Sequence, residues 1–462
     1  MTYGPATAAQ AVTGAGSGPS PARTLTVVSA ATALALMVYN AVMVTLPATA
    51  ASLHTPASAQ AWLLNGTPLG LAAALLVAGS LADDYGHRRV FLSGTVGLAL
   101  ATAAGAMATS TWMFTLARVA QGVASAALLA ASLGLLVHAY PTAQGRRRAT
   151  GVWGASISAG TATGPVLAGA MPGWRLAYAV LAALVALVAL ACARTLAESR
   201  SPRPGRADLL GAAVFGLALV CLVAALTLGR AGFLRTPVVL LTAAALAGLG
   251  VFALVERRAR NPLIDLALLR QRPFLGSAAA GLFAGLAVIS LFSYLPTLFE
   301  RLLGLSPMEA AGLFLLWAGL SAAVALQTRR LGPRFTPSHL LACGFTLHAI
   351  GALTLLGAFG SQTWQRLLPC LLISGIGTGL LNAALPQAAV ESVPPDRAAM
   401  GSGAQQTFRY IGSCTGVALT IVLATTEGRS ATTGADLAIG LSAGLALIGA
   451  LAVLLLRTRP AR

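Results

Sequence analysis

The sequence contains no lysine and few charged residues of any kind. All thirty basic residues are arginine, twelve residues are acidic, and charged residues make up 9% of the 462-residue chain against 57% hydrophobic residues. A soluble domain carries roughly 25% charged residues, so water cannot be the main solvent of this surface. The absence of a lysine amine also excludes Schiff-base chemistry and a P-loop ATPase.

Patterns of metal sites and of common enzymes are also missing. The five cysteines lie in apolar runs without CxxC or Cys/His spacing, which favours core packing over a metal or disulfide site. The sequence has no HExxH, GxSxG or Walker A run, and no polar stretch long enough for a soluble sensing domain. We therefore expect no cofactor and no metal, and we disfavour a membrane enzyme or a receptor.

Long apolar runs dominate what is present. A membrane-spanning helix needs about 20 mostly apolar residues. Fourteen candidate segments begin near residues 26, 60, 90, 112, 149, 174, 208, 236, 274, 307, 337, 367, 401 and 433. The chain also has 50 glycines, and small residues let membrane helices approach closely. The sequence thus predicts an all-α polytopic membrane protein with a tightly packed bundle.

The arginines indicate the topology. With both termini in the cytoplasm, 22 arginines fall in cytoplasmic segments and 6 in outer loops, and an even number of spans preserves this bias. The formal charge of +18 comes from short clusters between apolar runs rather than from one basic face, so nucleic acid is not an expected partner. We expect a multi-pass protein of a bacterial plasma membrane, and twelve spans remain possible if two weak segments fail.

Polar interruptions suggest the domain boundaries. The run from Arg194 to Asp208 is polar and proline-containing, as expected of a hinge between two halves. We expect a disordered cytoplasmic tail (1–24), an N-terminal six-helix bundle (25–195), a linker (196–207), an inserted helix pair (208–256), a cytoplasmic loop (257–273), a C-terminal six-helix bundle (274–456) and a short tail (457–462).

The loop after the second apolar segment combines glycines, an acid and an arginine pair. Glycines permit a tight turn, and the charges can clamp neighbouring helix ends, although the positive-inside rule alone also explains the arginines. The spacing of the whole run resembles motif A, GxLADxxGxRxx, of the major facilitator superfamily. In that family the motif is a gate element between two halves. The resemblance assigns this role to Gly79, Asp83, Gly86, Arg88 and Arg89.

An arginine lies inside the fourth apolar segment, where a charged side chain costs several kcal/mol. Snorkelling to the membrane interface is one explanation of Arg118, which is only a turn or two from Trp112. The run resembles motif B, RxxQGxG, of the same superfamily, with Ala124 replacing the second glycine. The resemblance implies proton coupling or a core hydrogen-bond network for Arg118, Gln121 and Gly122.

The fifth apolar segment contains a proline flanked by glycines. A proline frees a carbonyl and kinks the helix, and glycines let a partner pack against the bend, so helix packing alone could explain the run. Its spacing resembles motif C, GxxxGPxxGG, which is associated with antiporters and exporters, although Ala168 replaces one glycine. The corresponding residues are Gly160, Gly164, Pro165 and Gly169.

Three segments of the second half extend the resemblance. Residues 262–274, 304–313 and 393–412 are similar, in order, to the fourteen-helix drug/proton antiporter branch of this superfamily. The resemblance implies the major facilitator fold, with two six-helix bundles and an inserted helix pair. It also implies alternating access and mostly monomeric proteins.

One departure from that branch concerns proton coupling. The first-helix pattern LDxTIVNxALP carries an acid where this chain has Val38, and no acid lies in the middle of any expected span. Proton antiport normally needs a titrating group, most often a buried carboxylate. The remaining candidates are His348, Glu309 and Asp83, although His348 is more simply explained as a hydrogen-bonded core histidine.

A ligand would be expected near the midplane between the halves. Polar or aromatic residues that could line this region, but could equally serve as anchors or packing, are Asn40, Asn65, Gln121, Trp153, Phe292, Tyr294, Trp317, Asn382 and Gln405. The leading prediction is a proton-driven exporter of small amphiphilic or neutral, drug-like molecules. The alternative is a gradient-independent uniporter or importer of a metabolite, which the missing acid keeps open.

Overall fold

The computed structural model describes residues 20–198, 209–228, 234–258, 268–328, 335–361, 363–393, 398–425 and 430–456. Helices make up almost all of these ranges, and strands are absent from them. The α-helices are α1 Pro21–Ser52, α2 Gln60–Tyr85, α3 His87–Ala106, α4 Thr111–Ala139, α5 Ala143–Ala170, α6 Trp174–Thr195, α7 Leu209–Leu228, α8 Thr236–Arg258, α9 Arg272–Phe283, α10 Ser290–Leu303, α11 Pro307–Gln327, α12 Pro337–Leu353, α13 Leu368–Glu391, α14 Ala398–Thr425 and α15 Ala431–Leu456. A π-helical segment, Ala284–Ile289, joins α9 to α10, and single 3₁₀ turns lie at 57–59, 268–270, 358–361 and 364–367.

The prediction of an all-α polytopic membrane protein is confirmed. In the described ranges, eleven helical stretches are long and apolar enough to cross a membrane. One of them, Arg272–Leu303, runs continuously through α9, the π-helical segment and α10. Helices α2 and α5 are not among the eleven, and α7 contributes the shorter apolar stretch Ala213–Leu226. The number fourteen therefore stays a prediction.

Local sequence signals fix where the helices begin. Helix α1 starts at Pro21, four residues before the predicted start of the N-terminal bundle at residue 25, because Ser20 caps it. The Ser20 hydroxyl accepts a hydrogen bond of 3.3 Å from the Arg23 backbone N–H. Ser110, Thr142, Ser306 and Thr336 cap α4, α5, α11 and α12 in the same way. The predicted linker begins where α6 ends, at Thr195, and residues 199–207 lie outside the described residues.

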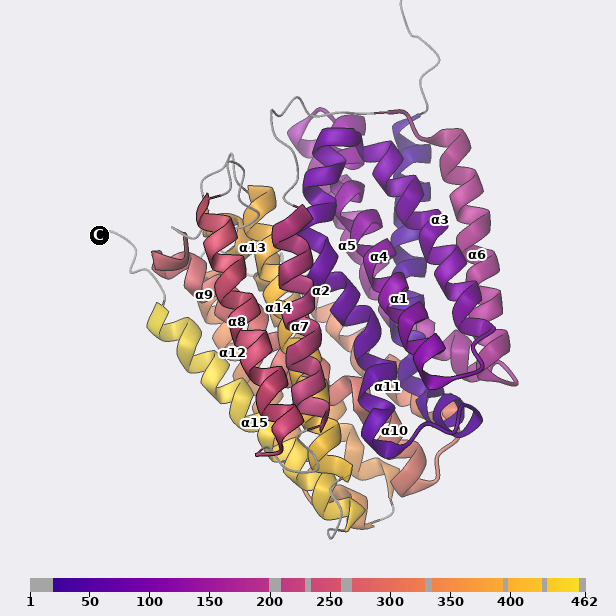
Figure 1. Cartoon of the computed structure of the whole chain (residues 1–462), viewed down its shortest axis with the longest axis vertical. Coiled ribbons are helices and arrows are strands. Elements are labelled where there is room, and N and C mark those ends of the chain that lie inside the picture. Colours follow the sequence, from indigo (N-terminus) through magenta and orange to yellow (C-terminus); the bar gives the residue numbers. More distant parts are fainter. Residues whose placement is uncertain are drawn as a thin grey trace, which may run out of the picture.

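The helices form two groups with a pair beside them (Figure 1). Helices α1–α6 form the N-terminal group, and α9–α15 form the C-terminal group. Helix α7 packs along α8 and also contacts α2 and α14, one helix from each group. This arrangement is compatible with two bundles and an inserted pair, while the predicted domain boundaries themselves stay predictions.

Glycines permit the close crossings in the N-terminal group. A Cβ on Gly122 of α4 would collide with the Thr67 carbonyl oxygen of α2, and a Cβ on Gly70 would collide with the Val119 carbonyl oxygen. On α5, a Cβ on Gly160 would meet the Ala33 carbonyl oxygen of α1. Backbones approach this closely only where no side chain intervenes, as expected for membrane helices that associate by packing.

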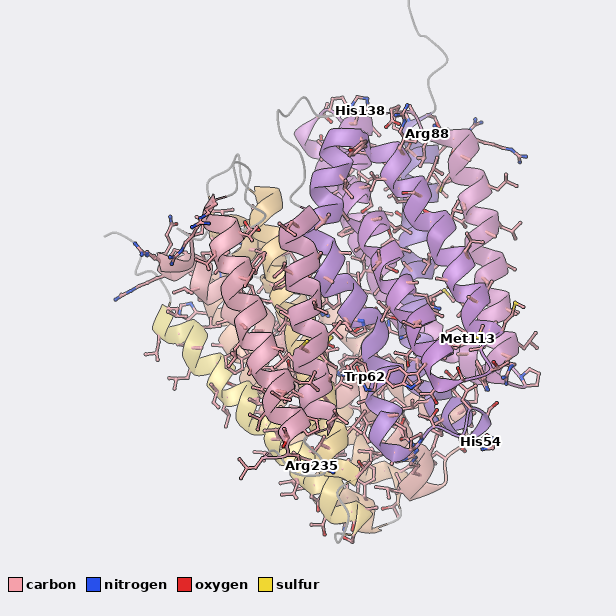
Figure 2. The ribbon with its side chains drawn as sticks, viewed as in Figure 1. His54, Trp62, Arg88, Met113, His138 and Arg235 are labelled. Atoms are coloured by element: carbon pink, nitrogen blue, oxygen red, sulfur yellow. The ribbon has the colours of Figure 1, made fainter. Side chains whose placement is uncertain are left out.

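The two ends of the molecule are distinguished by labelled residues in Figure 2. We call them the Arg88 end, which also carries His138, and the His54 end, which also carries Arg235. Toward the His54 end the two groups touch: Arg301 of α10 donates a hydrogen bond of 3.0 Å to the Gln60 side chain of α2. A Cβ on Gly169 of α5 would lie 2.9 Å from the Pro307 carbonyl oxygen of α11.

A second set of contacts joins the groups nearer to mid-depth. The Asn65 side chain of α2 donates a hydrogen bond of 3.0 Å to the Cys414 carbonyl oxygen of α14. The Tyr39 and Tyr410 rings lie 6.3 Å apart between α1 and α14. These hydrogen bonds and ring contacts join the N-terminal and C-terminal groups at two levels.

Candidate functional site

Arg118 is fully buried in α4 and is held by neutral acceptors. Its side chain is 1% exposed, so it does not snorkel to an interface. Nη1 donates to the Val38 carbonyl oxygen at 2.9 Å and to Gln121 Oε1 at 3.0 Å, and Nη2 donates to the Tyr39 carbonyl oxygen at 3.0 Å. The guanidinium thus links α4 to the middle of α1.

The neighbouring motif residues support this link. Gln121 supplies one acceptor, and Gly122 lets α2 approach so closely that the Thr67 hydroxyl donates to the Arg118 carbonyl oxygen at 3.1 Å. No acidic side chain among the described residues pairs with Arg118. The geometry fits the core hydrogen-bond network that motif B implied, and a part in proton coupling stays a prediction.

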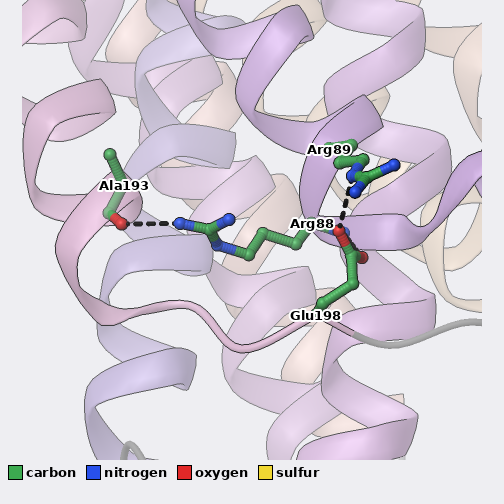
Figure 3. A network of polar contacts seen from close by, with 4 residues as sticks. All are labelled: Arg88, Arg89, Ala193 and Glu198. Atoms are coloured by element: carbon green, nitrogen blue, oxygen red, sulfur yellow. Dashed lines mark hydrogen bonds and ion pairs between the residues drawn. The ribbon is translucent and has the colours of Figure 1, made fainter.

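We call the motif A run at the junction of α2 and α3, residues 79–89, the gate loop. Within the described residues, it contacts the segment that follows α6 (Figure 3). Gly86 has φ +103°, a left-handed conformation that favours glycine, and a Cβ there would lie 2.5 Å from Glu198 Oε1. The same Oε1 accepts a hydrogen bond of 3.2 Å from the Arg88 backbone N–H, near the start of α3. Glu198 Oε2 lies 3.5 Å from Arg89 Nε.

The Arg88 side chain completes this cluster. Its Nη2 donates to the Ala193 carbonyl oxygen at 2.8 Å, near the end of α6 (Figure 3). The arginine pair thereby ties the start of α3 to the chain that leads into the predicted linker. Gly79 faces open space, and the side chain of Asp83 lies outside the described part of the structure. The gate role of these residues stays a prediction.

Motif C residues divide into two packing roles. Gly160 and Gly164 face α1 within the N-terminal group: a Cβ on Gly164 would lie 2.6 Å from the Met37 carbonyl oxygen. Gly169, one turn further along α5, faces Pro307 of the C-terminal group instead. Pro165 lies inside the continuous helix between these contacts. The run therefore combines packing inside one group with contact between the groups.

His348 of α12 is buried and hydrogen-bonded through both ring nitrogens. Ser442 donates its proton to the Ala287 carbonyl oxygen at 2.9 Å, so it accepts from His348 Nε2–H at 3.0 Å. Nδ1 lies 2.7 Å from the Ser374 hydroxyl, from which it accepts a hydrogen bond when the ring is neutral. The Ser442 contact places a proton on Nε2. They tie α12 to α13, to α15 and to the π-helical segment.

The proposed coupling residue Glu309 has a structural explanation. Its Oε2 accepts hydrogen bonds from the Ser306 backbone N–H at 2.7 Å and the Ser306 hydroxyl at 2.8 Å, and the Glu309 N–H donates to that hydroxyl at 3.3 Å. This capping box begins α11 at the His54 end. A proton-coupling role for Glu309, His348 or Asp83 stays a prediction.

The residues proposed to line a ligand site fall into three sets. Asn40 donates to the Leu36 carbonyl of its own helix at 2.7 Å, and Trp153 Nε1 donates to the Thr32 hydroxyl at 3.1 Å, so both stabilise the N-terminal group. Asn65 joins the two groups, as described above. Gln121 of α4 accepts from Arg118, as described above, and the C-terminal group holds the other five: Phe292, Tyr294, Trp317, Asn382 and Gln405.

Three of these five belong to contacts that the sequence did not reveal. Asn382 accepts from Arg409 Nη2 at 3.3 Å and donates to the Ser321 hydroxyl at 3.3 Å, which forms a polar line across α14, α13 and α11. Trp317 stacks on Phe292 with ring centroids 4.0 Å apart. Arg409, Ser321, Glu198, Ser374 and Ser442 were not among the predicted site residues. The sequence signal that could have found most of them is a polar residue inside an apolar span. The position of such a residue in the chain does not identify the residue that it binds.

Comparisons with known proteins agree with this architecture. The sequence profile of the Major Facilitator Superfamily matches residues 28–417. The puromycin resistance protein pur8 of Streptomyces alboniger is 30% identical over 86% of this chain and 80% of its own length. The multidrug resistance protein Stp of Mycobacterium tuberculosis is 32% identical over 78% of this chain and 67% of its own length.

A solved structure shares the fold at low identity. The bacterial homologue of the human lysosomal transporter Spinster, in an inward-facing and occupied conformation, superposes with a TM-score of 0.68 at 15% identity and covers 96% of this chain and 100% of that one. The peptide transporter POT gives a TM-score of 0.69 at 17% identity, covering 95% of this chain and 94% of that one. The profile match and the eleven helical stretches of the described ranges that are long and apolar enough to cross a membrane lead to one conclusion: the chain belongs to the Major Facilitator Superfamily of membrane transporters.

Proposed function

We propose that the protein is a secondary active exporter of small drug-like or natural-product molecules, working by alternating access. The observation that carries this proposal is the similarity, over about four-fifths of the chain, to relatives named for multidrug efflux or antibiotic resistance. The export direction is supported by the motif C residues of α5, which pack against α1 and α11, because the motif they resemble is associated with antiporters and exporters. The fourteen-helix branch, with α9 and α10 as one span, and a monomeric state are part of the proposal.

The orientation follows from the arginines. The predicted cytoplasmic segments, with 22 arginines, include the Arg88 end, so we place this end in the cytoplasm together with both termini. The groups touch at mid-depth and toward the His54 end, which would then be the outer end. The observed arrangement would accordingly be inward-facing, the state that receives a substrate from the cytoplasm.

Proton influx is the proposed driving force. The candidate groups are Asp83, Glu309 and His348, in the absence of the first-helix acid. Arg118 without a carboxylate partner and Val38 at the family's acid position favour a second candidate, a gradient-independent uniporter.

Purified protein in proteoliposomes tests the proposal. A pH dye inside the vesicles, an imposed proton gradient and a panel of drug-like solutes would report coupled flux. Substrate-dependent proton movement supports antiport, and substrate flux that ignores the gradient supports the uniporter. Asp83→Asn, Glu309→Gln and His348→Gln then test the coupling residues, because retention of proton-coupled transport by all three would remove them as candidates.

A further inference from the structure

The deeply placed charges of the described helices are positive. Arg118 lies two turns into α4, and Arg409 lies near the middle of α14. Every acidic residue of the described helices lies within the first or last two turns of its helix. In the described helices, mid-depth between the groups is therefore flanked by guanidinium groups and not by carboxylates.

The positive charge of Arg118 is solvated but not cancelled. Its acceptors are the carbonyl oxygens of Val38 and Tyr39 and the amide oxygen of Gln121, all of them neutral, and its Nε–H is buried without a partner. Inside a protein, where the effective dielectric constant is far below that of water, an uncompensated charge acts strongly on neighbouring charges. This charge favours an anion and disfavours a cation nearby.

Arg409 extends the same field into the C-terminal group. Its only hydrogen bond in the described structure is a long one of 3.3 Å to the amide oxygen of Asn382, and its Nε–H is buried without a partner. The polar line from Arg409 through Asn382 to Ser321 crosses α14, α13 and α11. The two outer helices of this line border the N-terminal group, because α14 contacts α2 and α11 contacts α5.

Further hydrogen-bond donors in the C-terminal group lack acceptors. The Trp317 Nε1–H and the Gln405 side-chain amide are buried and unpaired, and Gln405 lies one helical turn before Arg409. Buried polar groups in native proteins are nearly always satisfied, so each of these two donors is available to an acceptor that the chain itself does not supply. Trp317 also stacks on Phe292, which places an aromatic surface in the same group.

The Tyr39–Tyr410 contact brings the two arginines to one level. Arg118 binds the Tyr39 carbonyl oxygen on α1, Arg409 precedes Tyr410 on α14, and the two tyrosine rings are 6.3 Å apart. We propose that the interface around Arg118, Arg409 and Asn382 binds an amphiphilic organic anion, an aromatic body that carries a carboxylate, sulfonate or phenolate. This inference rests on the proposed export function and specifies the charge of its substrate.

Two dyes with the same xanthene ring system test the sign of that charge. Fluorescein is anionic and rhodamine 6G is cationic. A comparison of their export rates from dye-loaded proteoliposomes therefore reports the effect of substrate charge at similar molecular shape. The expected result is export of fluorescein at least tenfold faster than that of rhodamine 6G. If rhodamine 6G were exported and fluorescein were not, the anion site would be wrong, but the proposed export function would be unaffected. If neither dye nor any solute of the panel above were exported, the result would contradict both the anion site and the export function.

Variants then locate the site. Arg409→Gln is expected to slow fluorescein export about tenfold, the equivalent of 1.4 kcal/mol, while Arg235→Gln, at an exposed arginine of the His54 end, leaves it unchanged. Asn382→Asp retains Arg409 but places a carboxylate beside it, and it should reduce fluorescein export and raise that of rhodamine 6G. If Asn382→Asp and Arg409→Gln, each folded as judged by its melting temperature, both exported fluorescein at the wild-type rate, the assignment would be wrong.

Discussion

Arg118 Nη1 donates a hydrogen bond of 2.9 Å to the backbone carbonyl oxygen of Val38, the residue at the position where the fourteen-helix branch carries an acid. The chain thus keeps the arginine of motif B and supplies backbone oxygens in place of a side-chain carboxylate. Together with the contact to Tyr39, this bond fixes α1 against α4 at mid-depth. The buried charge is accommodated without an ion pair.

A lysine should not be able to replace Arg118, whose planar guanidinium group makes several hydrogen bonds at once. Arg118→Lys retains the charge, but an ammonium group cannot reach both α1 carbonyls and Gln121 with the same geometry. Because a hydrogen bond to a charged group contributes about 1.5–3 kcal/mol, we expect a loss of about 2 kcal/mol in stability, measured as a lower melting temperature in detergent. Arg89→Lys, at a side chain 64% exposed, is the control and should change stability by less than about 0.5 kcal/mol. Equal melting temperatures for the two variants would contradict this account.

Glycine positions on α5 allow a matched test of close packing. Gly164 faces the α1 backbone, whereas nothing lies within 4 Å of a Cβ built on Gly154 of the same helix. Gly164→Ala is expected to lower the melting temperature by an overpacking cost of about 1–3 kcal/mol. Gly154→Ala should be neutral or stabilising by up to about 1 kcal/mol, since alanine favours the helix.

The sequence predicted the helices well because their signals are local. The expected segment starts near residues 60, 112, 174, 236, 307 and 337 lie within one residue of the observed helices, since caps such as Ser110 and Ser306 directly precede apolar runs. The start near residue 149 was six residues late, because α5 begins at Ala143, behind the cap Thr142 and before the arginine cluster of residues 146–148. A polar first turn conceals a helix from a reading based on hydrophobicity.

The site was predictable only in part, because its partners are distant in the chain. Motif spacing identified Arg118, but not that the carbonyl oxygens of Val38 and Tyr39, about eighty residues earlier, would bind it. Backbone acceptors have no sequence signature. Ser442 is one of many hydroxyl residues in apolar spans, and only the packing of α12 against α15 brings it to His348.

Glu198 should act on the gate loop mainly through the backbone of α3. Its pair with Arg89 is largely exposed, and such pairs contribute about 0–1 kcal/mol, so a double-mutant cycle of Arg89→Ala and Glu198→Ala should give a small coupling energy. Glu198→Ala should cost more than Arg89→Ala, because it also removes the acceptor of the Arg88 N–H. Melting temperatures of the four proteins measure both quantities, and a smaller cost for Glu198→Ala would contradict the capping role.

His348 should stabilise the C-terminal group without setting the pH dependence of transport. The Ser374 and Ser442 contacts hold it as a hydrogen-bond bridge beside the π-helical segment. His348→Ala and Ser442→Ala should each lower stability by about 1–3 kcal/mol and leave the pH profile of substrate flux at the wild-type position. A shift of that profile in His348→Ala, without one in Ser442→Ala, would identify His348 as a proton site after all.

Restoring the family's acid at position 38 should change both charge preference and coupling. The Val38 Cβ is within about 6 Å of the Arg118 guanidinium, because only the short path through its own carbonyl separates them. Val38→Asp would therefore neutralise Arg118 locally and supply a buried carboxylate that titrates. We expect fluorescein export to fall, rhodamine 6G export to rise, and export of the cation to depend more steeply on the proton gradient than in the wild type. Val38→Asn, which has nearly the same shape and no charge, is the matched control and should produce neither the cation export nor the gradient dependence. If both variants behaved alike, the effect would be steric, and the charge of Arg118 would not govern the choice of substrate.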